Sequence, residues 1–352
     1  MSGLTKVGIL GAGSIARHHA AVVHALGGEV TAACTRRHDS PNWAGFSDVA
    51  PEAGRLPDVE AVLSAPQVEA VIACLDWKSQ SENLEKLLAC PKPVLLEKPI
   101  GFVASATKSI VRAAGESGKN KLVGYNRRFY EPVMILKDRI SQGGIKAVDV
   151  VISENIEAHV ERHGPEIVNH LLPFTSAHTL DLALHLLGSV KIVFVRPYRQ
   201  AIGNHEFVSY NGLLETESGI PVQLALNAND PSSVGLRCRF DDSTTWHLSP
   251  LETLTIYRGV DIVLPTPEFN IRQYRPKVHE RYIVDATLKP GFKEQGKAFL
   301  SGKYGPGANL AAAVGVLELI ESIVDCSSHD EGFGSLQPDV DGSALSATVT
   351  QS

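Results

Sequence analysis

Residues 6–20 read KVGILGAGSIARHHA, a short apolar run followed by a glycine-rich turn and then by a helix-forming stretch. Gly11, Gly13 and Ala16 form a G-x-G-x-x-A arrangement between the predicted strand and the predicted helix. The first glycine permits a tight turn, the second lets the backbone approach a pyrophosphate, and the alanine allows close packing of helix on strand. The stretch therefore predicts the first turn of a dinucleotide-binding parallel sheet.

The preference between NAD and NADP depends on the residues after the second predicted strand. The phosphates would bind at the main-chain N–H groups of Ser14 and Ile15, where the helix begins. An NAD site usually carries Asp or Glu about 20 residues after the turn, to bond the ribose 2′-hydroxyl. Here Thr35 takes that place, and Arg36 and Arg37 follow it. Because a guanidinium can hold a 2′-phosphate with two bonds, we predict NADP; NAD is the alternative if both arginines are merely solvated.

The rest of the chain shows two different patterns of apolar and polar residues. Up to about residue 125, short apolar runs such as VTAAC, VEAVIAC, KPVLLEK and KLVGYN alternate with amphipathic stretches, which predicts a doubly wound parallel sheet. After residue 145, long runs of alternating character such as AVDVVISENIEAHV and VKIVFVRPYR predict a mainly antiparallel sheet, with hairpin turns at ESG and FDDS. Near the end, residues 309–324 have helical periodicity.

Length and texture together predict an α/β protein of two domains, because 352 residues exceed one ordinary core. We expect an NAD(P)-binding Rossmann domain at 1–125 and a substrate and oligomerisation domain with a large, open, mainly antiparallel sheet at 126–325. Residues 326–352 are rich in Ser, Gly and Asp and predict a disordered tail.

Composition excludes several classes of function. A net charge of −6 with scattered Lys and Arg leaves no basic surface for nucleic acid. No apolar run approaches the roughly 20 residues that cross a bilayer, and the first residues carry no signal-peptide pattern, so we expect a cytoplasmic protein without a membrane partner. The five cysteines include no CxxC pair, which argues against a disulfide framework or a structural zinc site.

A lysine follows the strand-like run at 94–96. Glu97, Lys98 and Pro99 stand at the carboxyl end of the predicted parallel sheet, where open α/β folds bind ligands. Pro99 ends the strand and holds Lys98 at that edge. Alone, a lysine in this position is more often a surface residue than a catalytic one.

Taken together, three motifs resemble those of the Gfo/Idh/MocA family, the glucose–fructose oxidoreductase and inositol dehydrogenase group. The motifs are the glycine turn with His19, Glu97-Lys98-Pro99, and Asn126-Arg127-Arg128-Phe129. The resemblance, over about residues 5–325, implies a Rossmann domain, a second α/β domain, a homodimer or homotetramer, and hydride exchange between nicotinamide and a carbinol carbon of a sugar or cyclitol. The family's active-site lysine falls on Lys98, and Glu97 beside it is expected at the cofactor.

The family's second signature resembles D-x-G-x-H-x-x-D with a glycine seven residues later, and two registers compete for it in FTSAHTLDLALHLLG, residues 174–188. Pairing Asp181 and His185 with D-x-G-x-H would leave Gly188 only three residues after the histidine. Pairing His178 and Asp181 with H-x-x-D gives the required seven, so this register is preferred. It places Phe174 where the family has an aspartate.

A second departure from the family is Leu75-Asp76-Trp77-Lys78-Ser79, which replaces a P-N-x-x-H turn. Two common site residues are therefore missing, and the chain resembles a divergent member. Thr175 and Ser176 near the helix start could cap the helix or supply a hydroxyl to the site.

In the preferred register, His178 is the acid–base residue and Lys98 stabilises the developing alkoxide. Asp181 either orients His178 or engages the substrate, or it is a structural hydrogen-bonding residue. His185, one turn further along an apolar helix, is predicted to be a core histidine. No metal site is expected.

Other polar residues stay open. Arg127 and Arg128 could reach a substrate carboxylate or phosphate, or could form an interdomain ion pair. Tyr125 and Tyr130 flank them as possible proton donors. The run ENIEAHVERHGPE carries two further histidines, His159 and His163, on a loop that is either a lid or simply solvated.

The predicted function is an NAD(P)-dependent oxidoreductase acting on a sugar, a sugar derivative or a nucleotide-linked sugar. The alternative is a dinucleotide-binding regulatory protein that has kept the fold and lost the chemistry.

Overall fold

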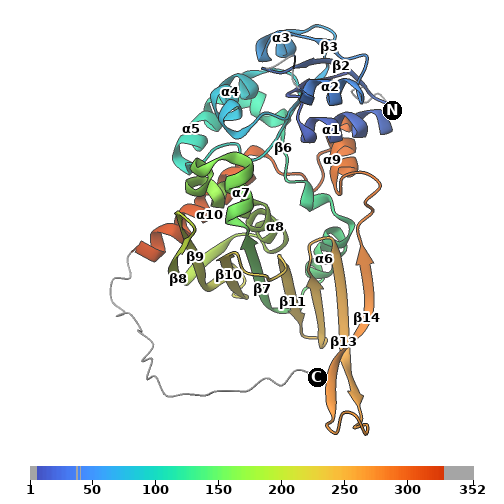
Figure 1. Ribbon diagram of the computed structural model, residues 1–352, viewed down its shortest axis with the longest axis vertical. Coiled ribbons are helices and arrows are strands. Elements are labelled where there is room, and N and C mark those ends of the chain that lie inside the picture. The colour runs from blue at the N-terminus through green and yellow to red at the C-terminus, as the bar shows by residue number, and fades with distance from the viewer. Residues whose placement is uncertain (1–5, 37–38, 40, 329–352) are drawn as a thin grey trace.

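The computed structural model describes residues 6–36, 39 and 41–328. Two sheets lie one above the other, with helices packed between and around them (Figure 1). The predicted α/β architecture is confirmed, since one sheet is entirely parallel and the other is mostly antiparallel.

The parallel sheet has the strand order β3-β2-β1-β4-β5-β6. Its central strand β4 reads AVIA and is buried at every position, because helices cover both faces of a doubly wound sheet. In spatial order the strands are β3 (Gly54–Arg55), β2 (Glu29–Cys34), β1 (Lys6–Leu10), β4 (Ala70–Ala73), β5 (Val94–Leu96) and β6 (Lys121–Val123).

The helices of this first domain alternate with its strands. They are α1 (Ser14–Ala25), α2 (Pro41–Ser47), α3 (Val59–Ser64), α4 (Trp77–Ala89) and α5 (Ala104–Ala114), followed by the 3₁₀ turn η1 (Gly115–Asn120). Helices α3 and α4 begin at aspartate caps: Asp58 accepts a hydrogen bond from the Ala61 amide, and Asp76 accepts one from the Ser79 amide.

The second sheet has the strand order β14-β13-β12-β11-β7-β10-β9-β8, in which β7 and β10 are parallel and the other neighbours antiparallel. The hairpin turns predicted at ESG and FDDS are confirmed, between β9 and β10 and between β11 and β12. The strands are β7 (Ile145–Glu154), β8 (Val190–Ile202), β9 (His205–Thr216), β10 (Pro221–Ala228), β11 (Gly235–Phe240), β12 (Thr244–Leu248), β13 (Thr253–Val263) and β14 (Gln273–Ile283).

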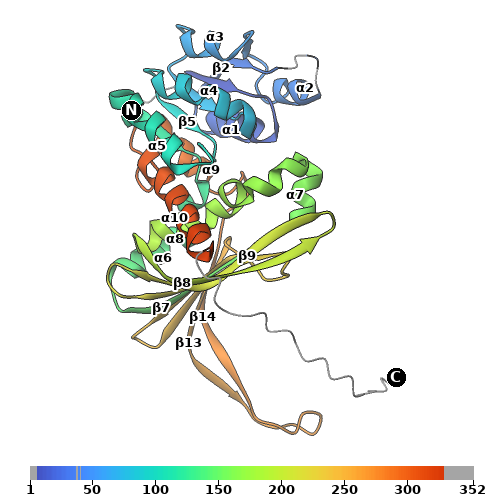
Figure 2. The same cartoon turned by 90° about the vertical axis from the view of Figure 1, so that its left-hand side faces the viewer.

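One face of the second sheet is covered by helices, and this face is turned toward the first domain (Figure 2). In β7 the residues Val148, Val150 and Ile152 are buried against this cover, while the alternate residues are partly exposed. The elements on this side are the 3₁₀ turns η2 (Asn126–Phe129) and η3 (Pro165–His170), the π turn η4 (Leu172–Ser176), and the helices α6 (Glu131–Ser141), α7 (Ile156–His163) and α8 (Ala177–Leu187).

One strand prediction was wrong in its second half. The run AVDVVISENIEAHV is a strand only as far as Glu154, and α7 follows. Asn155 caps this helix by accepting a hydrogen bond from the Ala158 amide, and Gly164, at φ +85°, ends it. An asparagine that satisfies a free helical N–H thus outweighs the strand propensity of the valine and isoleucine that follow.

The C-terminal helices return to the first domain. Helix α9 (Phe292–Ser301) packs on α1, and its Phe299 joins the hydrophobic cluster around β1. Helix α10 (Leu310–Ser328) contacts α5, α8 and β8. The helix predicted at 309–324 therefore continues to Ser328, so the tail predicted from 326 begins too early; residues 329–352 lie outside the described part of the chain.

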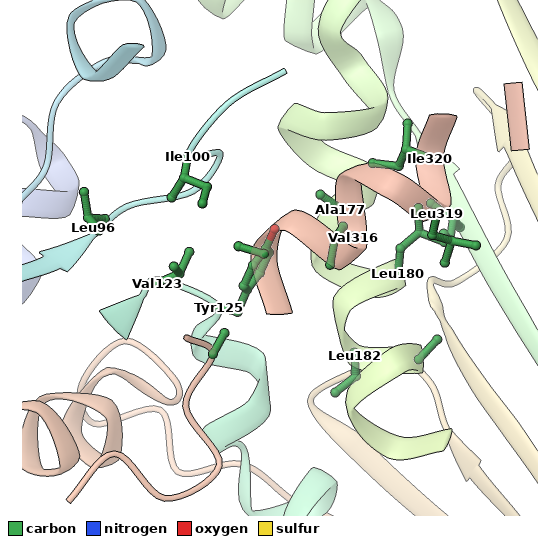
Figure 3. Close-up of a cluster of buried hydrophobic side chains, with 14 of the residues drawn as sticks. Leu96, Ile100, Val123, Tyr125, Ala177, Leu180, Leu182, Val316, Leu319 and Ile320 are labelled. Carbon is green, nitrogen blue, oxygen red and sulfur yellow. The ribbon is translucent and has the colours of Figure 1, made fainter. Parts of the chain in front are cut away.

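A single hydrophobic cluster connects the two sheets (Figure 3). Leu96 and Val123 come from the parallel sheet, Leu180 comes from α8, and Val316 and Leu319 come from α10. Because apolar burial is continuous from one domain to the other, the edges of the two sheets are held facing each other. In the described residues, no helix is long and apolar enough to cross a membrane.

Candidate active site

The glycine turn opens onto a cavity at the carboxyl edge of the parallel sheet. Gly11 has φ +93°, and a Cβ there would lie 2.4 Å from the carbonyl oxygen of Cys74, so only glycine fits. A Cβ on Gly13 would meet no atom within 4 Å, which leaves open space in front of the first turn of α1. Helix α1 starts at Ser14 without a side-chain cap, so its first N–H groups are available to an anion.

This first cavity, of about 520 Å³, is lined by Gly11, Gly13, Thr35 and Arg36. The Arg36 guanidinium lies at its edge and pairs with the Asp76 carboxylate at 2.7 Å. The other predicted arginine, at 37, lies outside the described residues. Further carboxylates line the same cavity: Asp58, Glu60 and Glu82.

A second cavity, of about 540 Å³, lies beside the first between the two domains, and Cys74, Leu75 and Asp76 line both. Its wall brings together residues that the sequence analysis singled out from separate motifs: Ile15, Glu97, Lys98, Arg127, Tyr130, His159, His163, Phe174, Thr175 and His178. The two cavities are therefore neighbours with a common wall, one at the glycine turn and one at the predicted chemical centre.

The turn that carries Lys98 is held from two sides. His19 Nε2, on the buried side of α1, lies 3.0 Å from Glu97 Oε1. The side-chain amide of Gln80 donates to the carbonyl oxygens of Glu97 and Pro99, the latter at 2.9 Å. Glu97 thus positions the turn as well as lining the cavity.

Lys98 is partly buried, and its ammonium group contacts Phe174 twice. The Nζ atom donates to the Phe174 carbonyl oxygen and lies 4.7 Å from the centre of the ring. Burial lowers the pKa of Lys98 to about 8, against the opposing effect of the Glu97 carboxylate. Lys98 is therefore still mostly cationic near neutral pH but loses its proton far more readily than a surface lysine.

His178 faces the same cavity from the first turn of α8. Its Nδ1 atom is buried and has no hydrogen-bond partner within the described protein, and its ring lies edge-on to Tyr125 at 5.9 Å. Burial lowers the pKa of His178 well below its usual value, and the cations Lys98, Arg127 and Lys289 lower it further. The imidazole is therefore neutral near pH 7 and free to accept a proton.

Asp181 does not line the cavity. Both of its carboxylate oxygens accept hydrogen bonds from Arg128, at 2.8 Å from Nε to Oδ2 and 2.5 Å from Nη2 to Oδ1, and its side chain is 1% exposed. Burial raises the pKa of Asp181 to about 6 although Arg128 lowers it. The arrangement corrects the catalytic interpretation of Asp181 in favour of the structural one, and Arg128 forms an ion pair rather than a substrate contact.

Two further expectations for this segment were wrong. Neither hydroxyl caps α8: the Thr175 hydroxyl donates to the Leu171 carbonyl, and the Ser176 hydroxyl donates to Glu154 Oε1 at 2.7 Å. A π turn at 172–176 runs directly into the helix, so the chain needs no capping side chain there. His185, as predicted, lies away from the cavity; burial lowers its pKa to about 4.

The segment that replaces the P-N-x-x-H turn joins the two domains. Trp77 lines the second cavity and packs edge-on against Phe102 at 5.3 Å. Lys78 pairs with Glu166 of η3 at 2.5 Å. Where the chain departs from the family motif, Trp77 therefore forms an aromatic part of the cavity wall, and Lys78 forms a surface ion pair between the domains.

Helix α7 forms the outer wall of the second cavity. His159, Arg162 and His163 all line it, and the His163 ring lies 4.8 Å from that of Phe174. The loop predicted for these histidines, as a lid or as a solvated segment, is instead a capped helix; His163 is exposed, and one side of the helix lines the cavity.

Sequence analysis missed one buried carboxylate. Glu154 is the last residue of β7 and is buried on the same side of the strand as Val148, Val150 and Ile152, next to η4. Its Oε1 accepts from Ser176, its Oε2 lies 3.5 Å from His159 Nε2, and its charge raises the pKa of Lys98. The sequence carried a signal for this residue, because the alternation of the strand places an acidic residue on its buried side.

Glu252, Lys289 and Phe292 also line the second cavity, although they lie far along the chain from the motifs. No local pattern marks them, because Glu252 lies in the turn before β13 and the other two residues reach the cavity through the return of the chain after β14.

The adjoining cavities fit a nicotinamide dinucleotide. The open space at Gly13 and the free N-terminus of α1 suit a pyrophosphate, and His178 lines the second cavity, where the reacting groups would meet. Within the described part of the chain, no three His, Cys, Asp or Glu side chains gather as metal ligands do.

Comparison with known proteins agrees with this geometry. Residues 5–125 match the model of the GFO_IDH_MocA family, an oxidoreductase family with an NAD-binding Rossmann fold. Inositol 2-dehydrogenase of Paracoccus denitrificans (strain Pd 1222) is 26% identical over 246 residues, which are 66% of this chain and 70% of that protein.

Solved structures extend the likeness beyond the first domain. A myo-inositol dehydrogenase from Corynebacterium glutamicum has a TM-score of 0.69 and 15% identity, covering 93% of this chain and 97% of its own. UDP-N-acetylglucosamine 3-dehydrogenase from Acidithiobacillus ferrooxidans has a TM-score of 0.68 and 17% identity, covering 92% and 98%. At these identities the likeness is one of fold.

Proposed function

From the premise that the N-terminal domain of this chain belongs to the Gfo/Idh/MocA oxidoreductase family, we propose that the chain is an NAD(P)-dependent dehydrogenase or reductase of sugar-type CH–OH groups. One observation carries the proposal. Lys98, which follows a strand of the parallel sheet, and His178, from the second domain, line one cavity, which adjoins the cavity at the glycine turn. A regulatory protein without chemistry would have no use for a buried neutral imidazole beside a lysine with a lowered pKa.

The two side chains have complementary tasks. The nicotinamide of the bound cofactor accepts or supplies the hydride. In oxidation His178, neutral at working pH, takes the proton of the substrate hydroxyl; in reduction it returns a proton to the carbonyl oxygen. Lys98 donates a hydrogen bond to the same oxygen and stabilises its developing negative charge. The Phe174 ring lies 4.7 Å from the ammonium group and covers one side of it, and the low dielectric of a partly buried site strengthens that interaction.

For the cofactor we propose NADP, bound through Arg36. Its guanidinium is 77% exposed at the edge of the first cavity, where Thr35 replaces the usual acid. The observation that favours NAD instead is the acidic lining of this cavity, since Asp58 and Glu60 would repel a 2′-phosphate.

We also propose that the chain forms a homodimer or homotetramer. Strands β13 and β14 extend beyond the rest of their sheet as an arm (Figures 1 and 2). The arm exposes Val260, Ile262, Ile271, Tyr274 and Val278. Exposed apolar side chains gathered on one hairpin are typical of a surface that a second copy covers.

Transfer of deuteride from labelled NADPH to a panel of keto-sugars tests the proposed reaction. We expect stereospecific transfer by the native chain, and a loss of at least about a hundredfold in Lys98→Met and in His178→Ala. His185→Ala is the matched control, because this histidine lies on the same helix but away from the cavity.

Two outcomes would contradict the proposal. Full turnover by the double variant Lys98→Met/His178→Ala would refute the assigned roles. A native chain that binds NADPH tightly, yet transfers deuteride to no member of the panel, would instead identify the regulatory alternative.

A further inference from the structure

The second cavity has an unusual balance of charge for a site that would hold a neutral sugar. Four cationic side chains line it: Lys98, Arg127, Arg162 and Lys289. Of its three carboxylates, Asp76 pairs with Arg36 at 2.7 Å. Glu97 and Glu252 remain, and Glu154 acts on Lys98 and Arg127 from behind the wall. Four cations therefore face three carboxylates, so the positive charges exceed the negative ones by one.

The cations are not held by partners of their own. Among the described residues, no carboxylate lies within 4.0 Å of the charged groups of Arg127, Arg162 or Lys289. Arg127 donates to the Thr179 hydroxyl at 3.0 Å, and burial lowers its pKa while Tyr130, Glu252 and Glu154 raise it. Arg162 is exposed, but Arg127 and Lys289 are partly buried. A partly buried cation without a paired anion costs free energy, so the retention of these two in a cavity wall indicates a ligand that offsets the cost.

The chain neighbours of Arg127 and Lys289 contact each other, and both cations line the second cavity. The Asn126 side chain donates to the Pro290 carbonyl at 2.9 Å. Gly291 comes so close to Asn126 that an added Cβ would lie 2.3 Å from the Asn126 carbonyl oxygen. The segment after β14 therefore packs against η2, and Arg127 and Lys289, which flank this contact, both line the second cavity.

The nearby cations also lower the pKa values of two histidines in the cavity wall. The pKa of His178 is lowered first by burial and then by Lys98, Arg127 and Lys289. The pKa of His163 is lowered by burial and then by His159, Arg162 and Lys98. Burial, the larger cause, disfavours any charge, but the contribution of the neighbouring cations is the part that favours an added anion.

We propose that the substrate of this cavity is an anionic sugar or polyol, carrying a carboxylate or a phosphate group that Arg127 and Lys289 bind. The inference rests on the proposed dehydrogenase function and names its substrate class. The planar guanidinium matches the two oxygens of either anion, and the ammonium of Lys289 adds a second contact. The carbon that exchanges hydride lies between this pair and the Lys98–His178 centre. The cofactor phosphates have their own place at the glycine turn.

Equilibrium binding tests the inference without turnover. Isothermal titration of the full chain, loaded with NADPH, compares D-glucuronate, D-glucose 6-phosphate and neutral D-glucose. We expect one anion or both to bind at least about tenfold more tightly than glucose, because a charge-assisted hydrogen bond contributes more than a neutral one. The advantage should shrink as salt is added. The comparison of the two sugars also tells a carboxylate site from a phosphate site.

Variants locate the anion. Lys289→Met and Arg127→Gln should each reduce the affinity ratio of anion to glucose about tenfold, and the glutamine keeps a donor for Thr179. Lys191→Met and Arg199→Gln on the exposed edge strand β8 are the matched controls. The two test variants differ in burial, so a folding defect in Arg127→Gln would leave Lys289→Met to decide.

Equal affinity of the native chain for the anions and for glucose would overturn the inference. So would a loss of NADPH affinity in Lys289→Met, measured without sugar, that matches the loss of anion affinity, because the cluster would then serve the cofactor. If the anions bind as expected but no deuteride is transferred, the proposed reaction fails and the anion site stands.

Discussion

The ammonium group of Lys98 donates to the main-chain carbonyl of Phe174 and lies 4.7 Å from the centre of its ring. By the resemblance to the family, an aspartate would stand at 174 and face the lysine. Phe174 instead gives Lys98 a carbonyl dipole and a ring face, which attract a cation more weakly than a carboxylate does. Burial lowers the pKa of Lys98 to about 8, and the charges of Arg127 and Lys289 lower it further.

The first prediction concerns the alkaline limb of the pH profile. If cationic Lys98 is required, kcat/KM of the native chain falls as pH rises through about 8, because a lysine with a lowered pKa loses its proton there. In Phe174→Asp the new carboxylate favours the charged lysine, so the limb should move upward by about one unit or more. Phe174→Asn is the control of equal size without charge. An unchanged limb in the aspartate variant would mean that another group titrates.

The second prediction concerns Glu154, whose charge raises the pKa of Lys98. Glu154→Gln keeps an acceptor for Ser176 but removes the charge, so the alkaline limb should move to lower pH, opposite to Phe174→Asp. The exposed Glu157→Gln on α7 is the matched control. A limb that moves upward, or an equal shift in the control, would exclude Glu154 as the carboxylate that supports Lys98.

The third prediction concerns cofactor choice. Arg36→Asp should weaken NADPH binding by about 10- to 100-fold and leave NADH binding equal or stronger, because the guanidinium contact is lost and a carboxylate repels the 2′-phosphate. Fluorescence titration with both cofactors measures the ratio. Asp76→Asn, which removes the partner of Arg36, is the companion variant. Unchanged discrimination in Arg36→Asp would refute the role of Arg36.

The fourth prediction concerns the buried pair of Arg128 and Asp181. Arg128→Met leaves a buried carboxylate without its cation and should lower the free energy of unfolding by about 3–5 kcal/mol. The double variant Arg128→Met/Asp181→Leu should recover most of that loss, since two apolar side chains then replace the pair. Urea unfolding measures both variants. A double variant that is stable but has lost deuteride transfer would restore a catalytic role to Asp181.

The fifth prediction concerns the arm formed by β13 and β14. Ile262→Asp/Ile271→Asp should convert the oligomer to a smaller species, because two charges enter the exposed apolar surface. Sedimentation velocity measures the change, and Val193→Asp on the opposite edge of the sheet is the control. A native chain that sediments as a monomer would contradict the proposed assembly.

Much of the fold was predictable because its signals are local. The glycine turn lies where a strand must give way to a helix, and Gly11 has no room for a side chain. The strands before residue 125 can be recognised from their short apolar runs, and the two hairpin turns from their turn-forming residues. Where the sequence misled, at 155–163, a cap of one residue decided between strand and helix.

The site was predictable only in part. The spacing to Gly188 identified His178, and the end of a parallel strand identified Lys98; both line the cavity. The sequence left Asp181 ambiguous, because spacing cannot say whether Arg128 or the cavity receives a carboxylate on a buried helix.

By itself, the sequence determined the glycine turn, the parallel sheet and the two residues proposed for the chemistry, since each depends on neighbours within a few positions. Only the tertiary structure decided what surrounds them. Arg127 and Lys289 are far apart in the chain and line one cavity, where Asn126 is hydrogen-bonded to the Pro290 carbonyl. The net charge of a cavity depends on the side chains of all its walls. These walls come from distant parts of the chain, and the hydrophobic core that both domains share brings them together.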